Sequence, residues 1–494
     1  MTAIPAKRLL SARRSRTSSC VGSFPADMPT HPSTNPHVPL GWVIAATSLG
    51  FVVVQLDVTV VNVALPKIGT DLRASVSVLQ WIVDAYALTF AVLLLSAGSL
   101  GDRFGSKRLF MLGFGLFAAA SLACGLAPTG ALLVAGRALQ GIGAALLVPT
   151  SLALLNHAAG HEARVRARAV GLWTAAGGVA IAAGPLVGGL LLGTLGWRSI
   201  FLVNVPICAI GIAMTARVPD TSRLRDARRL DSLGQTLAII ALAGLIAAVI
   251  EARPLGVTHP LVLAGGVLAI ACGAGFVISE RRSRSPMVPP EIFAGGHLTP
   301  LIAFGTLVNL TYYGIIFVLS LYLQQLLGYS AIRAGVAYLP LTATFIVSNV
   351  ISGWLTGRTG ARTPMLVGAL IGALGFALLL RLTGSSTYSS MLVAFILIPA
   401  GMGLAVPAMT TATLAAVDRK WAGTASALLN TARQAGGAIG VAIFGALVGG
   451  GKDHIVGGLH AASIASTALL LAAALLAWMG VVAGTYVQRP SEGA

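Results

Sequence analysis

Long apolar runs separated by short polar segments dominate the chain. Each of these runs is long enough to cross about 30 Å of hydrocarbon as a helix. They fall near residues 42–64, 79–100, 109–127, 131–153, 170–192, 199–216, 233–250, 261–278, 299–319, 335–355, 364–380, 391–414, 423–448 and 461–483. The pattern predicts an all-α membrane protein with 14 transmembrane helices, and the even number places both termini on one side.

The composition agrees with a chain whose solvent is a bilayer. Hydrophobic residues make up 56% of the 494 residues and charged residues only 10%, whereas a soluble domain carries about 25% charged residues. This excludes a soluble globular protein. The 59 glycines are scattered through the apolar runs, where small residues let membrane helices approach closely.

The net charge of +18 does not indicate a nucleic-acid partner, because the basic residues occupy short loops between apolar runs. With the N-terminus in the cytoplasm, 24 of the 33 Lys and Arg residues fall in cytoplasmic segments and 7 in outer loops. Short loops rich in positive residues stay on the cytoplasmic side of the membrane. We therefore expect a multi-pass protein of the cell (cytoplasmic) membrane with both termini cytoplasmic, whose positive charge attracts anionic membrane lipid.

The sequence also repeats itself. GSLGDRFGSK over residues 98–107 returns as GWLTGRTGAR over 353–362, an offset of 255. The pair Gly143 and Pro149 returns as Gly401 and Pro407 at an offset of 258, and residues 176–178 return as 435–437 at 259. Three matches in order at nearly constant offset predict two related halves of six spans each, with spans seven and eight inserted between them.

These boundaries give the expected domain organisation. It comprises a cytoplasmic basic tail over 1–39, an N-terminal six-helix bundle over 40–217, a linker with two inserted transmembrane helices over 218–297, a C-terminal six-helix bundle over 298–484 and a cytoplasmic tail over 485–494. The first tail has no apolar segment of its own, so it is not a signal peptide. Met28 offers an alternative start within it.

Four local motifs carry a family resemblance. They are LDVTVVNVALP over 56–66, the Gly-x-x-x-Asp-Arg-x-Gly pattern that starts at Gly98, RALQGIG over 137–143 and GPLVGG over 184–189. From about Trp42 to the last span, the sequence resembles the major facilitator superfamily, and within it the fourteen-span drug:proton antiporter (multidrug efflux) family. The resemblance implies two six-helix bundles that export lipophilic or cationic drugs or antibiotics by alternating access, driven by the proton gradient and without a cofactor.

The resemblance also implies roles for motif residues. It links Arg137 to proton coupling and assigns an antiporter motif to Gly184, Pro185, Gly188 and Gly189. It assigns a conformational gate to Gly98, Asp102, Arg103, Gly105 and Lys107. The second half departs from the pattern, since Gly357 stands in the place of Asp102 and the C-terminal spans contain no acid. Coupling is therefore expected to depend on the N-terminal half.

Asp57, Asp84, Arg137 and Arg433 are the ionisable residues that lie well inside predicted spans. Such a residue costs about 2.5–3.5 kcal/mol on insertion scales and is a functional candidate by default. A rise of 1.5 Å per residue places Asp57 about 10 Å, and Asp84 and Arg137 about 9 Å, below the outer helix ends. The three can therefore meet at one depth, where at least one aspartate could titrate and couple transport to protons. The alternative is that Arg137 and one aspartate form an ion pair that only fixes helix packing, but this alternative leaves the second aspartate unexplained.

Polar and aromatic residues within the spans are candidates for a substrate cavity. Gln55, Thr59 and Asn62 share one helix face, opposite to that of Asp57. The candidate cavity residues are Gln55, Thr59, Asn62, Trp81, Asn309, Tyr312 and Arg433. For the aromatic residues, anchoring at the membrane surface is the alternative interpretation.

Two motifs also admit a plainer interpretation. The charges around Asp102 can be a solvated turn, although an acid among positive residues favours a pairing role. Pro185 removes a helix hydrogen bond and its neighbouring glycines permit bending or close contact, but glycines also serve ordinary helix packing.

Other function classes find little support. His157 and His161 lack a third metal ligand, and no Walker-type loop for ATP is present. The loops are too short to hold an enzyme's nucleophile, base and oxyanion donors, and a receptor would add a soluble domain. We expect a monomer that binds a small lipophilic or cationic substrate and protons. The alternative is a dedicated exporter of one endogenous metabolite or self-made antibiotic.

Overall fold

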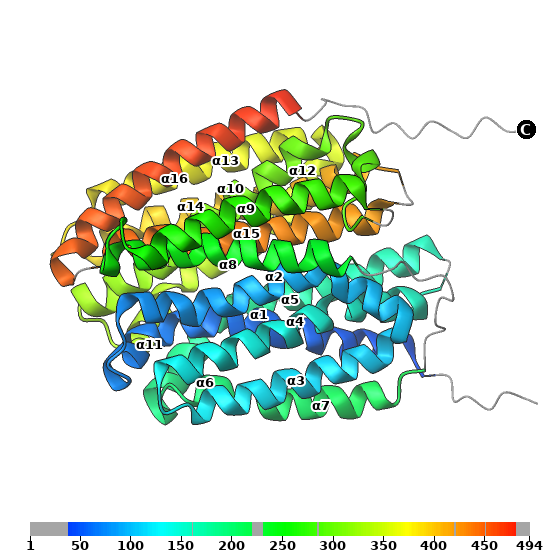
Figure 1. The fold of residues 1–494 in the computed structure, drawn as a ribbon, viewed down its shortest axis with the longest axis horizontal. Coiled ribbons are helices and arrows are strands. Elements are labelled where there is room, and N and C mark those ends of the chain that lie inside the picture. The colour runs from blue at the N-terminus through cyan, green and yellow to red at the C-terminus, as the bar shows by residue number, and fades with distance from the viewer. Residues whose placement is uncertain are drawn as a thin grey trace, which may run out of the picture. The chain divides into compact units, whose positions relative to one another are not determined.

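The computed structural model describes residues 38–160, 162–219, 231–283, 286–418, 421–449 and 451–480 (Figure 1). Within these ranges the chain is helical and contains no strand, so the all-α prediction is confirmed. The predicted tails over 1–39 and 485–494 lie outside the described residues, apart from Val38 and Pro39.

The helices form three groups along the chain. The first group comprises α1 (Leu40–Asp71), α2 (Val76–Phe104), α3 (Ser106–Leu126), α4 (Gly130–Ala158), α5 (Ala163–Leu195), α6 (Ser199–Leu202) and α7 (Asn204–Ala216). Next come α8 (Ser232–Leu255), α9 (Pro260–Arg282) and the 3₁₀ turn η1 (Pro290–Phe293). The rest are α10 (Leu298–Leu321), the π turn η2 (Tyr322–Leu326), α11 (Ala331–Ala337), α12 (Leu339–Thr359), α13 (Arg362–Leu378), the 3₁₀ turn η3 (Leu379–Arg381), α14 (Tyr388–Ala415), α15 (Ala422–Val448) and α16 (Lys452–Gly480).

Thirteen helical segments of the described chain are long and apolar enough to cross a membrane. The bent helix α5 makes 14 if it counts as one span, so the predicted number is not confirmed. The bend of 41° lies between Ile181 and Ala183. Its cause is Pro185, which has no N–H to bond the carbonyl of Ile181 four residues earlier.

Several predicted span limits differ from the helices by four residues or more. Helix α1 continues to Asp71 and not to 64, and α5 begins at Ala163 and not near 170. The span expected over 335–355 starts at Ala331 and consists of α11 and α12, broken at Tyr338. The last span begins at Lys452 and not near 461. Its polar start escaped the hydropathy pattern, although Asp453 in the first turn favours a helix N-terminus.

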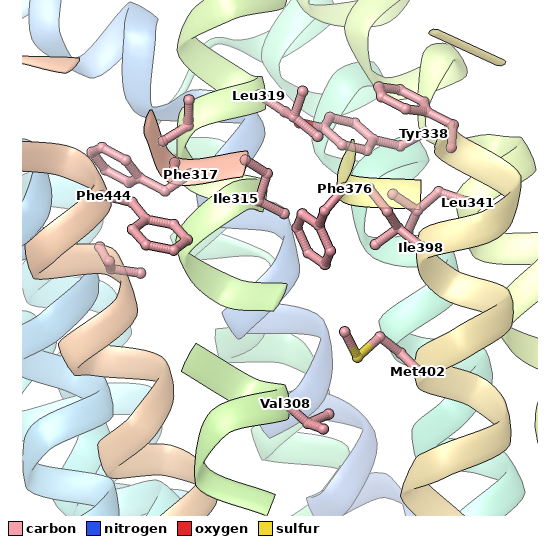
Figure 2. Close-up of a cluster of buried hydrophobic side chains, with 14 of the residues drawn as sticks. Val308, Ile315, Phe317, Leu319, Tyr338, Leu341, Phe376, Ile398, Met402 and Phe444 are labelled. Carbon is pink, nitrogen blue, oxygen red and sulfur yellow. The ribbon is translucent and has the colours of Figure 1, made fainter. Parts of the chain in front are cut away.

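The helices pack in two sets. Helices α1–α7 contact mainly one another, and so do α10–α16 except for the short α11, which packs mainly against α5 of the first set. Helices α8 and α9 lie side by side, and α8 packs against both α2 and α15 (Figure 1). Buried apolar side chains of the second set interlock in its interior (Figure 2). They include Ile315 and Phe317 of α10, Phe376 of α13 and Ile398 of α14.

Glycines set the distance between some helix pairs. A Cβ atom on Gly368 of α13 would lie 2.5 Å from the carbonyl oxygen of Gly401 in α14, which is closer than real Cβ contacts allow. The high glycine content therefore has a structural use at this crossing.

The two sets are joined by hydrogen bonds at the end where α1 finishes, which we call the Asp71 end. Gln80 Nε2 of α2 donates to the carbonyls of Val441 and Ala442 in α15 at 3.2 and 2.7 Å. At the same end, α10 and η2 bond to the last third of α1.

Candidate functional site

A buried ion pair stands at the centre of the first helix set. Arg137 Nη1 of α4 pairs with Asp57 Oδ2 of α1, and their side chains are 2% and 0% exposed. Asp57 Oδ1 accepts hydrogen bonds from Gln140 Nε2 at 3.2 Å and from Asn204 Nδ2 at 3.0 Å. Both carboxylate oxygens of Asp57 are therefore satisfied by protein groups.

The guanidinium of Arg137 is held in one orientation. Its Nε donates to the carbonyl of Ile82 in α2 at 2.9 Å, and its Nη1 also donates to Gln140 Oε1 at 2.8 Å. Its Cζ lies 4.3 Å from the centre of the Tyr86 ring. Arg137 thus links α1, α2 and α4 through its planar fork, a geometry that Lys cannot reproduce.

Asp84 of α2 is in the opposite situation. It is fully buried, and neither carboxylate oxygen has a hydrogen-bond partner among the described residues. It lines a pocket together with Arg137, so all three predicted charges belong to one region. An unpaired carboxylate is costly to bury, and no group among the described residues compensates a charge on Asp84 as Arg137 does for Asp57.

Two pockets occupy the space between the helix sets. The first is lined by Thr59, Asn62, Val63, Ile181, Pro185, Tyr312, Tyr313, Ile316, Tyr338, Leu341, Thr342 and Phe345. The second is lined by Val58, Val61, Asn62, Val83, Asp84, Tyr86, Ala87, Arg137, Tyr313, Gln434, Gly437, Ala438 and Val441. Asn62 and Tyr313 line both, so the charged region is continuous with an apolar and aromatic one.

Three of the predicted cavity residues line these pockets, namely Thr59, Asn62 and Tyr312. Gln55 lines neither of the two pockets. Trp81 points to α8 instead, where its Nε1 donates to Glu251 Oε1 at 3.0 Å.

The remaining two cavity candidates lie in the second set. Asn309 is buried and its Nδ2 donates to the carbonyl of Gly305 in its own helix at 2.9 Å. Arg433 packs beside Gly305, and its Nη1 reaches Asn430 Oδ1 at 3.4 Å. The Nε of Arg433 has no partner in the described part of the chain.

Several site residues were not predicted. Gln140 stood within the motif around Arg137, and Gln434 directly follows Arg433, but neither was assigned a role. Asn204 begins α7 and faces Asp57. The sequence shows each of them as a polar residue inside an apolar run. That pattern does not reveal whether the side chain bonds a carboxylate or the backbone of its own helix.

The predicted gate residues surround the turn from α2 to α3. Gly105 has a φ of +96°, a conformation that favours glycine. Lys107 Nζ donates to the carbonyl of Ala216 at the end of α7 at 3.0 Å. Arg103 is exposed, and a Cβ on Gly98 would meet no described atom within 4 Å. The side chain of Asp102 lies outside what the structure describes.

The predicted antiporter motif lies between α1 and α11. A Cβ atom on Gly184 would come within 2.6 Å of Thr59 Cβ, and one on Gly188 within 3.1 Å of the Val60 carbonyl oxygen. On Gly189 it would come within 2.9 Å of the Ala331 carbonyl oxygen in α11. The glycines therefore let α5 contact both helix sets, while Pro185 bends α5 and lines the first pocket.

Comparison with known proteins identifies the family. The family model described as Major Facilitator Superfamily matches residues 47–441. The methylenomycin A resistance protein of Streptomyces coelicolor is 39% identical over 455 residues, which cover 92% of this chain and 94% of the relative. The multidrug resistance protein Stp of Mycobacterium tuberculosis is 38% identical, and the tetracenomycin C resistance and export protein of Streptomyces glaucescens 33%; each match covers 82% of this chain and 75% of the relative.

A solved structure supports the fold. A bacterial homologue of the human lysosomal transporter Spinster, in an inward-facing and unoccupied conformation, superposes with a TM-score of 0.63. The match covers 91% of this chain and 98% of the other at 19% identity. The predicted superfamily and the all-α transporter fold are thereby confirmed.

Proposed function

The chain belongs to the major facilitator superfamily, and we propose that it exports lipophilic or cationic drugs across the cell membrane in exchange for protons. As a member of this family it is a multi-pass membrane transporter and not an enzyme. The relatives' names, which refer to methylenomycin A, tetracenomycin C and multidrug resistance, support drugs or antibiotics as the substrate class. The proton gradient is the energy source, and no cofactor is needed.

The observation that carries the proposal is the contrast between the two aspartates. Asp57 has a full set of partners, whereas Asp84 is equally buried and has none among the described residues. A carboxylate whose oxygens all have hydrogen-bond or ion-pair partners is suited to stabilise the packing of helices. An unpaired carboxyl in a pocket is suited to take up and release a proton as its surroundings change.

We assign the exchanged proton to Asp84. While its pocket is closed, the neutral form avoids an unpaired charge in a low-dielectric site. When the pocket opens to water, hydration stabilises the carboxylate and the proton can leave. A cationic substrate stabilises the carboxylate in the same way, so substrate and proton compete for one group, as antiport requires.

The pocket lining suits a lipophilic substrate. Tyr312, Tyr338 and Phe345 present aromatic surfaces in the first pocket, and Tyr313 joins it to the pocket of Asp84. Aromatic faces attract organic cations by about 0.5–2 kcal/mol each. Because residues of both helix sets line the pockets, relative movement of the sets would expose the substrate first to one side and then to the other.

The test is transport by purified protein in lipid vesicles, with ethidium as the probe and an imposed pH gradient. We expect ethidium accumulation that follows the direction of the gradient and stops with a proton uncoupler. Ethidium that enters the vesicle should be matched by protons that leave it, so the lumenal pH should rise as ethidium accumulates. Accumulation that ignores the uncoupler would contradict proton exchange.

A further inference from the structure

Pro66 removes the helical partner of a backbone acceptor in the last third of α1. In a helix the carbonyl of residue 62 bonds the N–H of residue 66, but proline has no N–H. Pro66 lies within α1, and Asn62 is only 6% exposed. A buried carbonyl without a partner costs about 1–3 kcal/mol, so the Asn62 carbonyl needs a donor from another element.

Helix α10 of the other set supplies that donor. Ser320 Oγ, which is fully buried, donates to the carbonyl of Asn62. Gln324 Nε2, in the π turn η2, donates to the carbonyl of Val63 at 2.9 Å and lies 3.3 Å from Ser320 Oγ.

The contact joins equivalent positions of the two halves. Asn62 and Ser320 are 258 residues apart, which falls inside the repeat offsets of 255–259. A residue that touches its own repeat mate lies on the pseudo-two-fold axis between the halves. At the same offset Gln324 corresponds to Pro66. The first half therefore has a proline without an N–H at the position where the second half has a glutamine that donates a hydrogen bond.

We propose that Pro66, Asn62, Val63, Ser320 and Gln324 form a releasable clasp that holds the two helix sets together at the Asp71 end. Pro66 is a positioning residue that creates the acceptor, and Ser320 and Gln324 are the donors. The side chains of Asn62 and Val63 also line the first pocket. The clasp therefore forms one wall of the pocket and opens when the pocket is exposed to that side, a role that rests on the proposed alternating access.

The experiment measures the distance between the two sets directly. Spin labels are attached at Thr70→Cys, near the end of α1, and Ser385→Cys, in the loop that Tyr322 Oη bonds through the Thr383 carbonyl. Both positions are exposed. The four native cysteines are replaced by alanine, and the full chain is studied in lipid nanodiscs by pulsed electron resonance without substrate.

For the unaltered clasp we expect a short distance with a smaller population at longer distance. Ser320→Ala with Gln324→Ala should at least double the longer-distance fraction. Pro66→Ala should do the same, because its restored N–H bonds the Asn62 carbonyl and competes with Ser320. Pro399→Ala in α14 and Ser463→Ala, whose hydroxyl bonds its own helix at 2.7 Å, are the matched controls and should change nothing.

Wild-type distances in the double variant and in Pro66→Ala would overturn the clasp. So would a single short distance in every variant, since the contact would then be a permanent joint. If the double variant aggregates, Ser320→Ala alone removes one donor and gives the same comparison. The measurement needs no substrate or proton gradient, so a failed transport assay with shifted distances would contradict the proposed antiport and leave the clasp intact.

Discussion

At the scale of single residues, Asp57 and Asp84 have the same chemistry and different surroundings. Asp57 accepts from Arg137, Gln140 and Asn204, whereas Asp84 has no partner within the described chain. Replacement of Asp57 by Asn therefore tests the stability of a hydrogen-bond network, whereas replacement of Asp84 by Asn tests the exchange of a proton.

Asp84→Asn should abolish proton exchange with no loss of stability. The variant removes a carboxyl that no hydrogen bond from the described residues holds, and an amide avoids the burial of a charge. We expect ethidium transport in vesicles to lose its dependence on the pH gradient, while the melting temperature of the purified protein stays the same or rises. Asp84→Glu is the control that keeps a titratable group. Gradient-driven exchange at the wild-type rate in Asp84→Asn would exclude it as the proton carrier.

Arg137→Ala should be far more harmful than Arg137→Lys. The alanine variant leaves the Asp57 carboxylate buried without its cation, which typically destabilises a protein by about 3–5 kcal/mol. Lys keeps the charge but loses the simultaneous contacts with Asp57, Ile82 and Gln140. Thermal unfolding and vesicle transport of the three proteins give the order. Equal stability and transport in all three proteins would mean that Arg137 neither stabilises the fold nor takes part in transport.

The sequence could predict the depth of these charges but not their pairing. Helix rise gives the height of a residue in the membrane, so Asp57, Asp84 and Arg137 were expected at one level. The direction of a side chain around its helix depends on which helices are neighbours. That is also why Trp81, a cavity candidate, lies against Glu251 of the inserted helix α8.

At the scale of helices, α5 is the element that touches both sets. Its glycines pack against α1 on one side and against α11 on the other, and Pro185 bends it. Span lengths, the repeat and the family motifs made the fold predictable from sequence. The breaks were less predictable, because the bend of α5 and the division into α11 and α12 occur inside continuous apolar runs.

Gly189→Ala should slow transport, whereas Gly178→Ala should not. Both residues lie in α5, so the two variants gain the same helix propensity, about 1 kcal/mol in favour of Ala. A Cβ on Gly189 would come within 2.9 Å of the Ala331 carbonyl oxygen, but one on Gly178 would meet no atom of the described chain within 4 Å. Initial rates of ethidium transport, compared at equal protein content, measure the difference. Equal rates would show that α5 and α11 do not need this close contact.

At the scale of the whole transporter, α8 links the two sets outside the repeat. It is bound to α2 near both of its ends, since Gln235 Nε2 donates to the Val92 carbonyl at 2.7 Å and Glu251 accepts from Trp81. It is bonded to α15 at the Asp71 end, where Arg253 Nη1 donates to the Ala446 carbonyl at 3.1 Å. If the sets move apart at this end, α8 should travel with α2 and the contact with α15 should break.

Arg253→Ala should therefore change the rate of turnover and leave substrate affinity nearly unchanged. Loss of a contact made in only one state shifts the populations of the two states, and apparent affinity changes only by the altered fraction of the competent state. Arg253 is largely exposed to solvent in its bond to Ala446, so the fold should tolerate the change. Ethidium binding and ethidium transport are measured on the same preparation, with Arg281→Ala of α9 as a surface-charge control. A large loss of affinity with unchanged turnover would mean that α8 shapes the binding site and does not set the balance between the states.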